Sequence, residues 1–228
     1  MFLENLLFPK FCVSCGFLGS YLCPKCEKKL SYIERDVCLY CGFPSFLGLT
    51  HPKCQKKFGL DGVMSIFHYN NVLKKVIKCV KYRLSTQVWQ ELKTVIKPEA
   101  AEKILRLKRL KQKFVMQPLP LHERRQRLRG FNQSSLIADF FNLVLDLPIV
   151  DCLKRQRSTL PQAQITESRK RYENIRGAFR VGSNATVSKN NFILVDDVIT
   201  SGLTLKEAAK ELKKAGAGYI YALTLAKG

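Results

Sequence analysis

The sequence predicts an α/β fold, with a parallel sheet flanked by helices and a small cysteine-rich module before it. Seven of the nine cysteines lie within residues 12–54. From about residue 61, apolar runs typical of buried strands alternate with segments of helical periodicity. We therefore expect a metal-binding module over residues 1–58 and an α/β domain over residues 59–228, which is long enough to bury a core.

Four pairs of metal-ligand residues, each with two residues between its members, occupy the module. They are Cys12/Cys15, Cys23/Cys26, Cys38/Cys41 and His51/Cys54. Eight such ligands suit two tetrahedral zinc sites that are structural, because protein atoms fill every position. Neighbouring pairs could share a site, or the pairs could interleave. A metal-free cluster is the alternative, but so short a segment could hardly fold without a metal. Cys79 and Cys152 stand alone and are expected in the core.

The elements of the α/β domain follow from periodicity and from the positions of proline and glycine. Strands are expected at residues 62–69, 114–119, 148–152, 192–195 and 219–225. Helices are expected at residues 71–82, 89–110 with an interruption at Pro98, 131–145 and 203–215. Residues 154–178 are polar and basic without clean periodicity, and we expect a long mobile loop with some helix.

The segment FILVDDVITSGLT, residues 192–204, carries the strongest chemical signal. Its apolar run ends at two adjacent acids, Asp196 and Asp197, and open α/β sheets bind ligands at this edge. Carboxylates accept hydrogen bonds from neighbouring sugar hydroxyls. Gly202 would let the backbone approach a phosphate, which the amino end of the following helix would attract. The pattern predicts a ribose 5-phosphate site, whereas an ordinary capped helix leaves the paired acids unexplained.

This segment resembles the phosphoribosyl pyrophosphate (PRPP) motif of type I phosphoribosyltransferases. Other segments resemble the ComF family of competence proteins, so the resemblance covers nearly the whole chain. They are the paired cysteines, PLPLH at 118–122, Arg124, Arg127, Arg129, GFNQ at 130–133, and Gln162, Arg169, Asn174 and GAF at 177–179. The resemblance implies a type I phosphoribosyltransferase fold with an N-terminal double zinc ribbon. It also implies an association with single-stranded DNA uptake and processing in natural transformation.

The resemblance also implies roles for residues. Asp196 and Asp197 would hold the ribose hydroxyls and be catalytic. The 5-phosphate would lie against Thr200, Ser201, Gly202, Leu203 and Thr204, and the pyrophosphate against a loop containing Leu119, His122, Arg124, Arg127 and Arg129. Residues 160–176 would close over the site. Mg²⁺ would be held largely by ligand oxygens and water. Lys81-Tyr82-Arg83 also matches a family segment, with no role implied.

The charge of the chain favours polyanionic partners. Lys and Arg number 39 against 18 acids, a formal charge of +21, and such an excess attracts nucleic acid or phosphorylated ligands. A solvated basic face without a partner is the alternative. We expect contacts with single-stranded DNA, without sequence preference, from basic residues in the middle of the chain. The candidates are Lys108, Arg109, Lys111, Lys113, Arg124 and Arg125.

Two functions remain open at this point. One is a phosphoribosyltransferase whose acceptor the sequence leaves unidentified, and the other is a nucleic-acid-binding accessory protein that uses the PRPP pocket as a sensor. No run reaches the roughly 18 apolar residues of a membrane span, and Met1–Phe8 lacks the basic start of a signal peptide. We expect a cytoplasmic protein, with the inner face of the membrane as an alternative and DNA-uptake proteins as candidate partners.

Overall fold

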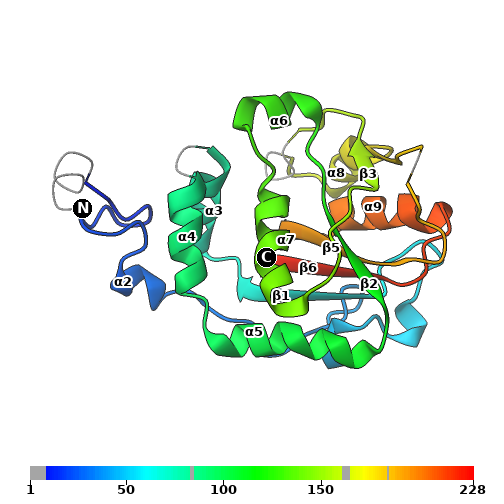
Figure 1. Ribbon diagram of the computed structural model, residues 1–228, viewed down its shortest axis with the longest axis horizontal. Helices are drawn as coiled ribbons and strands as arrows, with labels where there is room; N and C mark the ends of the chain where they lie inside the picture. The colour runs from blue at the N-terminus through cyan, green and yellow to red at the C-terminus, as the bar shows by residue number, and fades with distance from the viewer. Residues whose placement is uncertain (1–8, 83–84, 161–164, 184) are drawn as a thin grey trace.

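A computed structural model describes residues 9–82, 85–160, 165–183 and 185–228 (Figure 1). Arg83 and Gln162 of the motifs above lie outside the described residues. The central sheet has the strand order β1-β6-β5-β2, and all its neighbours are parallel. Its strands are β1 (Gly62–His68), β2 (Phe114–Pro118), β5 (Asn191–Ile199) and β6 (Ile220–Lys227). The predicted parallel α/β sheet is therefore confirmed.

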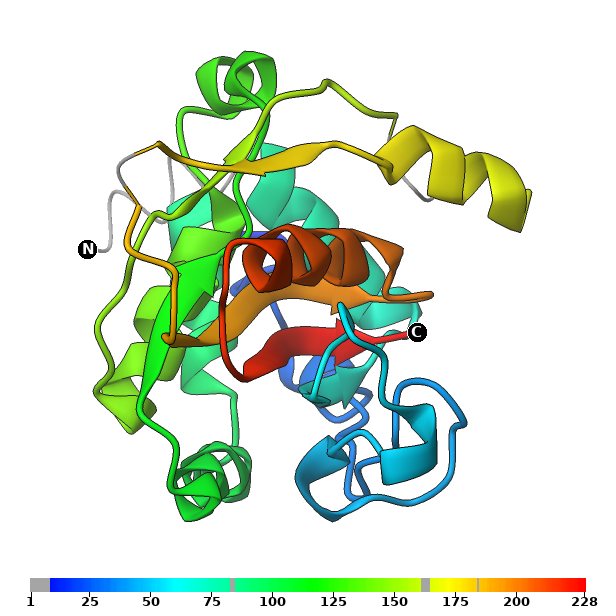
Figure 2. The same ribbon diagram turned by 90° about the vertical axis from the view of Figure 1, so that its right-hand side faces the viewer.

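Alternate side chains of β5 pack on opposite faces of the sheet, because successive residues of a strand point to opposite sides. Ile193 and Val195 join one apolar cluster, and Phe192 and Leu194 join the other. The first face is covered by α3 (Asn71–Tyr82), α4 (Ser85–Thr94), α5 (Pro98–Leu105), η3 (Arg106–Leu110) and α7 (Gln133–Leu145). The second is covered mainly by α9 (Leu203–Lys214), seen against the sheet in Figure 2. Burial on both faces explains the apolar runs of the central strands.

The helix expected over residues 89–110 is three separate elements, α4, α5 and η3. Pro98 is the first residue of α5, a position where its missing N–H costs nothing. The strand expected over residues 148–152 is wrong, since those residues only run beside β2. There the Met116 N–H donates to the Pro148 carbonyl and the Val150 N–H to the Met116 carbonyl, at 2.7 and 2.8 Å.

Two segments predicted mainly as loops contain more regular structure than expected, although some helix was expected in the first of them. Within residues 154–178 lies α8 (Ser168–Ile175), and β3 (Leu153–Arg155) pairs antiparallel with β4 (Phe179–Val181). The arginine-rich loop is a helix, α6 (Glu123–Arg129), that ends at Gly130 with φ 76°. With one apolar residue in seven, α6 offers no hydrophobic period to detect. Strands of three residues are likewise too short to show alternation.

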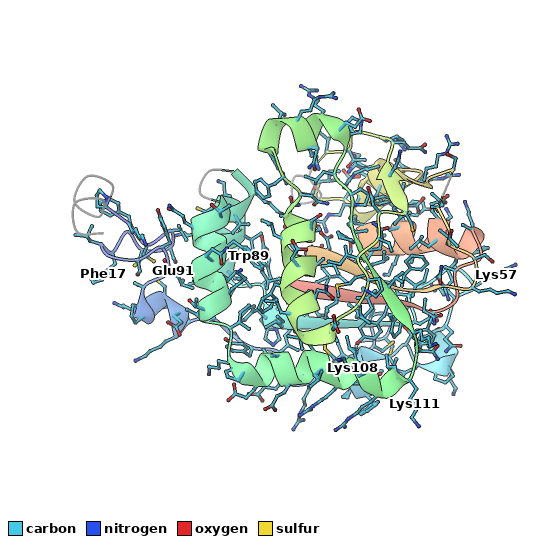
Figure 3. The ribbon with its side chains drawn as sticks, in the orientation of Figure 1. Phe17, Lys57, Trp89, Glu91, Lys108 and Lys111 are labelled. Carbon is cyan, nitrogen blue, oxygen red and sulfur yellow. The ribbon has the colours of Figure 1, made fainter. Side chains whose placement is uncertain are left out.

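The N-terminal segment forms two small ribbons with α2 (Pro24–Glu27), η1 (Phe46–Gly48) and η2 (Pro52–Cys54). The first ribbon, residues 10–30, packs on α4, where the Tyr21 and Leu22 N–H groups donate to the Glu91 carboxylate at 3.0 and 2.7 Å. The second ribbon, residues 36–57, packs beside β1 and β6. Figure 1 shows the two ribbons on opposite sides of the molecule, and Figure 3 labels Glu91 beside the first. Among the described residues, none of the helices is long and apolar enough to cross a membrane.

Candidate functional site

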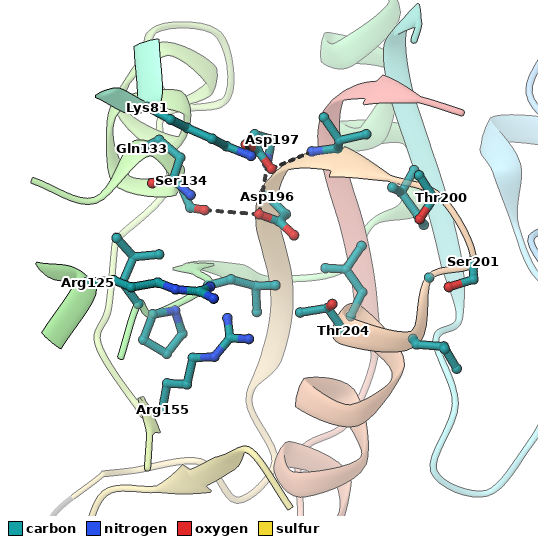
Figure 4. A pocket seen from close by; sticks show the side chains of 18 of the residues that line it. Lys81, Arg125, Gln133, Ser134, Arg155, Asp196, Asp197, Thr200, Ser201 and Thr204 are labelled. Atoms are coloured by element: carbon teal, nitrogen blue, oxygen red, sulfur yellow. Dashed lines mark hydrogen bonds and ion pairs between the residues drawn. The ribbon is translucent and has the colours of Figure 1, made fainter. Parts of the chain in front are cut away.

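A cavity of about 280 Å³ opens at the carboxyl end of β5 (Figure 4). Its walls come from β5, the loop leading to α9, α6, the start of α7, β3 and the end of α3. This is the edge where open α/β sheets bind ligands. Of the residues predicted for PRPP, the cavity is lined by Leu119, Arg129, Asp196, Asp197, Thr200, Ser201, Gly202, Leu203 and Thr204.

The two aspartates form the inner wall of the cavity. Asp196 Oδ1 accepts hydrogen bonds from Ser134 Oγ at 3.2 Å and from the Asp197 N–H at 2.9 Å. Asp197 is buried and forms an ion pair with Lys81 of α3. Burial, followed by the neighbouring Asp197 carboxylate, raises the pKa of Asp196 to about 7, although Lys81 acts in the opposite direction. A bound cation or hydrogen-bond donor would therefore favour the ionised form of Asp196.

The turn between β5 and α9 offers backbone amides to an anion. Gly202 adopts φ 70°, a left-handed conformation that favours glycine, and α9 begins directly after it without a side-chain cap. The first-turn N–H groups of this 12-residue helix therefore remain available to a ligand, and the helix dipole favours a negative charge there. Thr200 and Ser201 are exposed beside them. This wall suits a phosphate group.

The opposite wall carries arginines, namely Arg125 and Arg129 of α6, Arg155 of β3 and Arg171 of α8. Arg155 donates to Thr159 Oγ1 at 2.5 Å and lies 5.3 Å from the centre of the Phe179 ring. Burial and then the nearby Arg125 lower the pKa of Arg155 to about 10. Guanidinium groups held this close together repel one another, so a bound polyanion would be stabilised there.

Three residues predicted for the pyrophosphate side lie elsewhere. His122 caps α6, with its Nδ1 accepting from the Arg124 N–H at 3.2 Å. Arg124 and Arg127 are exposed and do not line this cavity, and Arg127 forms an ion pair with Glu123 at 3.5 Å. Arg125, expected to contact nucleic acid, lines the cavity and donates to the Thr159 carbonyl.

Three residues that line the cavity, Lys81, Ser134 and Arg155, have no predicted role. Lys81 belongs to a family segment, and that match was the only signal for it. Ser134 directly follows the GFNQ segment, and Arg155 lies in β3 without any motif. All three reach the cavity from elements other than β5.

The four cations Lys108, Arg109, Lys111 and Lys113 are exposed on η3 and on the segment that enters β2. They precede the amino end of β2, whereas the cavity lies at the carboxyl end of the strands. Figure 3 labels Lys108 and Lys111 at the edge of the molecule away from α6. A polyanion bound there would not compete for the cavity.

The eight predicted zinc ligands form two clusters. Cys12, Cys15, Cys23 and Cys26 make the first, and Cys38, Cys41, His51 and Cys54 the second, with all ligand atoms of a cluster within 4.8 Å of one another. Neighbouring pairs therefore cooperate, and the interleaved alternative is wrong. Gly16 and Gly42, which directly follow the ligands Cys15 and Cys41, adopt φ 79° and 74°, a left-handed conformation that favours glycine.

The surroundings of the ligands fit zinc. In each cluster burial would raise the pKa of one thiol, Cys12 or Cys38, but hydrogen bonds from backbone amides lower it to about 6, which favours the thiolate that zinc binds. Burial and the neighbouring thiols instead raise the pKa of Cys26 to about 12 and of Cys54 to about 11 while no metal is bound. His51 places Nδ1 3.2 Å from Cys41 Sγ, while its Nε2–H donates to the Pro44 carbonyl at 3.2 Å. A second hydrogen bond of this kind is usual for a zinc-bound histidine. With four protein ligands each, these are structural zinc sites.

Comparisons with known proteins agree with this geometry. A double zinc ribbon domain matches residues 3–56, and a phosphoribosyl transferase domain matches residues 133–228. The chain is 31% identical over 216 residues to Competence protein F of Haemophilus influenzae, covering 90% of each chain. It is 25% identical over 202 residues to Competence protein ComFC of Bacillus subtilis, covering 86% of this chain and 79% of the relative. It is 26% identical over 224 residues to DNA utilization protein YhgH of Escherichia coli, covering 94% and 96%. The chain therefore belongs to the ComF family of competence proteins, with a double zinc ribbon and a phosphoribosyltransferase domain.

Proposed function

We propose that this protein binds PRPP together with Mg²⁺ in the cavity and acts in the handling of single-stranded DNA during natural transformation. The observation that carries the proposal is the position of the acid pair. Asp196 and Asp197 lie between the amino end of α9 on one side and a group of arginines on the other. PRPP has a matching arrangement of groups, because its ribose hydroxyls lie between two negatively charged ends, the 5-phosphate and the pyrophosphate.

In this proposal, different residues of the cavity bind the three parts of PRPP. The amides and hydroxyls of the turn from Thr200 to Thr204 bind the 5-phosphate. The carboxylates of Asp196 and Asp197 accept hydrogen bonds from the ribose hydroxyls. Arg125, Arg129 and Arg155 bind the pyrophosphate, for which planar guanidinium groups are well suited.

Mg²⁺ fits the same site. The ion prefers oxygen ligands, retains several waters and is commonly held by one or two carboxylates with substrate phosphates. Burial and the adjacent acid raise the pKa of Asp196 to about 7, and a bound cation would stabilise the ionised form of this carboxylate. Bound there, Mg²⁺ would neutralise charge on the pyrophosphate.

Calorimetry with PRPP and Mg²⁺ tests the proposal. The double variant Asp196→Asn, Asp197→Asn should bind at least about tenfold more weakly, since it loses charge-assisted hydrogen bonds to the ribose. The double variant Asp139→Asn, Asp151→Asn removes the same charge from exposed positions and should bind like the wild type. Equal affinities in the two double variants would refute the ribose assignment.

Transfer and sensing remain separate outcomes for this pocket. In transfer, the acid pair would stabilise positive charge developing on the ribose as pyrophosphate leaves. In sensing, PRPP would bind and stay intact while the protein serves as a nucleic-acid-binding accessory factor. Pyrophosphate release measured with a panel of nitrogenous bases distinguishes the two. The names of the relatives, competence protein and DNA utilization protein, favour a role with DNA in either case.

The exposed cations are the proposed contact with single-stranded DNA. Lys108, Arg109, Lys111 and Lys113 lie within six residues of one another on the surface. Lys and Arg at such spacing can follow a phosphate backbone without reading its bases. Arg124 lies on a different exposed surface, on α6, whereas Arg125 reaches the cavity.

A further inference from the structure

The segment between two zinc ligands of the second ribbon, Cys38 to Cys41, contacts the phosphate-binding turn. We call this segment the second knuckle. A Cβ built on Gly202 would lie 3.2 and 3.5 Å from the two methyl carbons of Leu39. The Leu39 side chain therefore packs directly against the one residue of the turn that has a left-handed backbone. In Figure 2 the second ribbon lies near the end of β6 and the turn that leads into α9.

The neighbouring Tyr40 reaches the same turn through Lys206 of α9. The Lys206 ammonium lies 5.1 Å from the centre of the Tyr40 ring, and it donates to the Ser201 carbonyl at 3.0 Å. Tyr40 is itself fixed, since its hydroxyl oxygen accepts from the Leu60 N–H at 3.0 Å. Two contacts, Leu39 with Gly202 and Tyr40 through Lys206 with Ser201, thus join the knuckle to the turn.

The rest of the second ribbon is attached to β6, to α5 and to the residue before β1, and these contacts hold the knuckle in place. The Tyr221 hydroxyl donates to the Leu47 carbonyl, and the Thr50 N–H donates to the Asp61 carbonyl at 2.8 Å. Asp36 pairs with Lys103 at 2.8 Å. Within this anchored ribbon, Leu39 and Tyr40 lie between Cys38 and Cys41, two ligands of the second cluster.

We propose that the second zinc ribbon positions the phosphate-binding turn, with Leu39 and Lys206 as positioning residues that hold Gly202 and Ser201 in the conformation that binds the 5-phosphate. The second ribbon then sets the affinity for the phosphate end of the ligand. This inference rests on the proposed function. The first ribbon differs, because its equivalent segment contacts α3, where Lys75 donates to the Ser14 carbonyl at 2.6 Å.

The test separates the two ends of the ligand. Ribose 5-phosphate probes the turn, and pyrophosphate with Mg²⁺ probes the arginine wall. Leu39→Ala and Lys206→Met should each bind ribose 5-phosphate about tenfold more weakly, since a misplaced turn loses several aligned amides at once. Their affinity for pyrophosphate with Mg²⁺ and their zinc content should match the wild type. Leu39→Met should restore the affinity, because it refills the space against Gly202.

Val13→Ala is the matched control, since Val13 follows the first zinc ligand of the first ribbon as Leu39 follows that of the second. It should leave the affinity for both probes unchanged. Wild-type affinity for ribose 5-phosphate in both Leu39→Ala and Lys206→Met would overturn the inference and leave the proposed function standing. An equal loss of affinity for both probes would also overturn the inference, because the effect of the substitution would not be local to the turn. A wild-type chain that binds neither probe overturns both proposals.

Discussion

The ammonium of Lys81, at the end of α3, forms an ion pair with the buried carboxylate of Asp197 on β5. Burial would lower the pKa of Lys81, but the Asp197 charge outweighs it and raises that pKa. The lysine thus keeps a positive charge beside two adjacent acids. It also opposes the rise in the pKa of Asp196 that burial and Asp197 produce.

Lys81→Met should lower the free energy of unfolding by roughly 1–3 kcal/mol, because it leaves a buried carboxylate without its cation, and the partial exposure of Lys81 reduces the cost. Urea denaturation measures the change. Lys78→Met removes an exposed lysine from the same helix and should change it by less than about 0.5 kcal/mol. In the double variant Lys81→Met, Asp197→Asn the loss should be smaller than the sum of the two single losses. Simple additivity would show that the pair does not act as a unit.

The stability of the chain should depend on pH through Asp196. Its pKa in the folded chain, about 7, is raised above the value of an unfolded aspartate. The folded state therefore holds a proton that the unfolded state lacks, so the stabilisation is complete below about pH 4 and is lost as the pH rises through 7. Between about pH 5.5 and pH 8, the free energy of unfolding of the wild type should fall by roughly 2 kcal/mol relative to that of Asp196→Asn. The free energy of unfolding is measured for both proteins at each pH, and the difference between them removes the contribution of the zinc ligands, which both proteins share. If the two proteins lost stability in parallel as the pH rises, the raised pKa of Asp196 would be contradicted.

The two clusters should hold two zinc ions per chain, detectable by elemental analysis. Cys12→Ser and Cys38→Ser should each remove one, because a tetrahedral site that loses one thiolate binds zinc much more weakly. Cys79→Ser, outside both clusters, should retain two. Chelation should expose the backbone amides of residues 10–57 to hydrogen exchange, since metal binding supplies most of the folding energy of such ribbons. A chain that stays protected there after losing its metal would refute the structural role.

Single-stranded DNA should bind with an affinity that falls steeply as salt rises, since each phosphate contact releases counterions. Replacing Lys108, Arg109, Lys111 and Lys113 by Ala should flatten the salt dependence and leave PRPP affinity intact, because these residues lie away from the cavity. Replacing the exposed Lys25, Lys28, Lys74 and Lys78 changes the net charge equally and is the matched control. Anisotropy titrations of a labelled oligonucleotide at several salt concentrations measure the salt dependence of DNA affinity in both variants. The same slope in the two variants would remove the basis for a DNA contact at residues 108–113.

Much of the fold followed from local patterns. The runs at 192–195 and 219–225 predicted strands because residues buried on both faces of a parallel sheet are continuously apolar. The cysteine pairs predicted two metal sites because tetrahedral zinc needs four ligands, which the spacing supplies twice. By contrast, the prediction of a strand at 148–152 was wrong. The segment lies at the edge of the sheet beside β2 and forms only one bridge, to Met116, so its apolar composition is not accompanied by the ladder of hydrogen bonds that defines a strand.

The sequence by itself predicted the chemistry of the turn from Thr200 to Thr204, which we propose to bind phosphate, and it identified the zinc ligands, because those features are encoded in residues close together in the chain. Only the tertiary structure brought Lys81 to Asp197, Ser134 to Asp196 and Leu39 to Gly202. It also decided that Arg125 and Arg129, four residues apart on α6, line the cavity, whereas Arg124 and Arg127 do not. These relationships depend on how segments far apart in the sequence pack against one another. Hydrophobic periodicity shows which face of an element is buried, but it does not show which charged residue of another element will lie beside it.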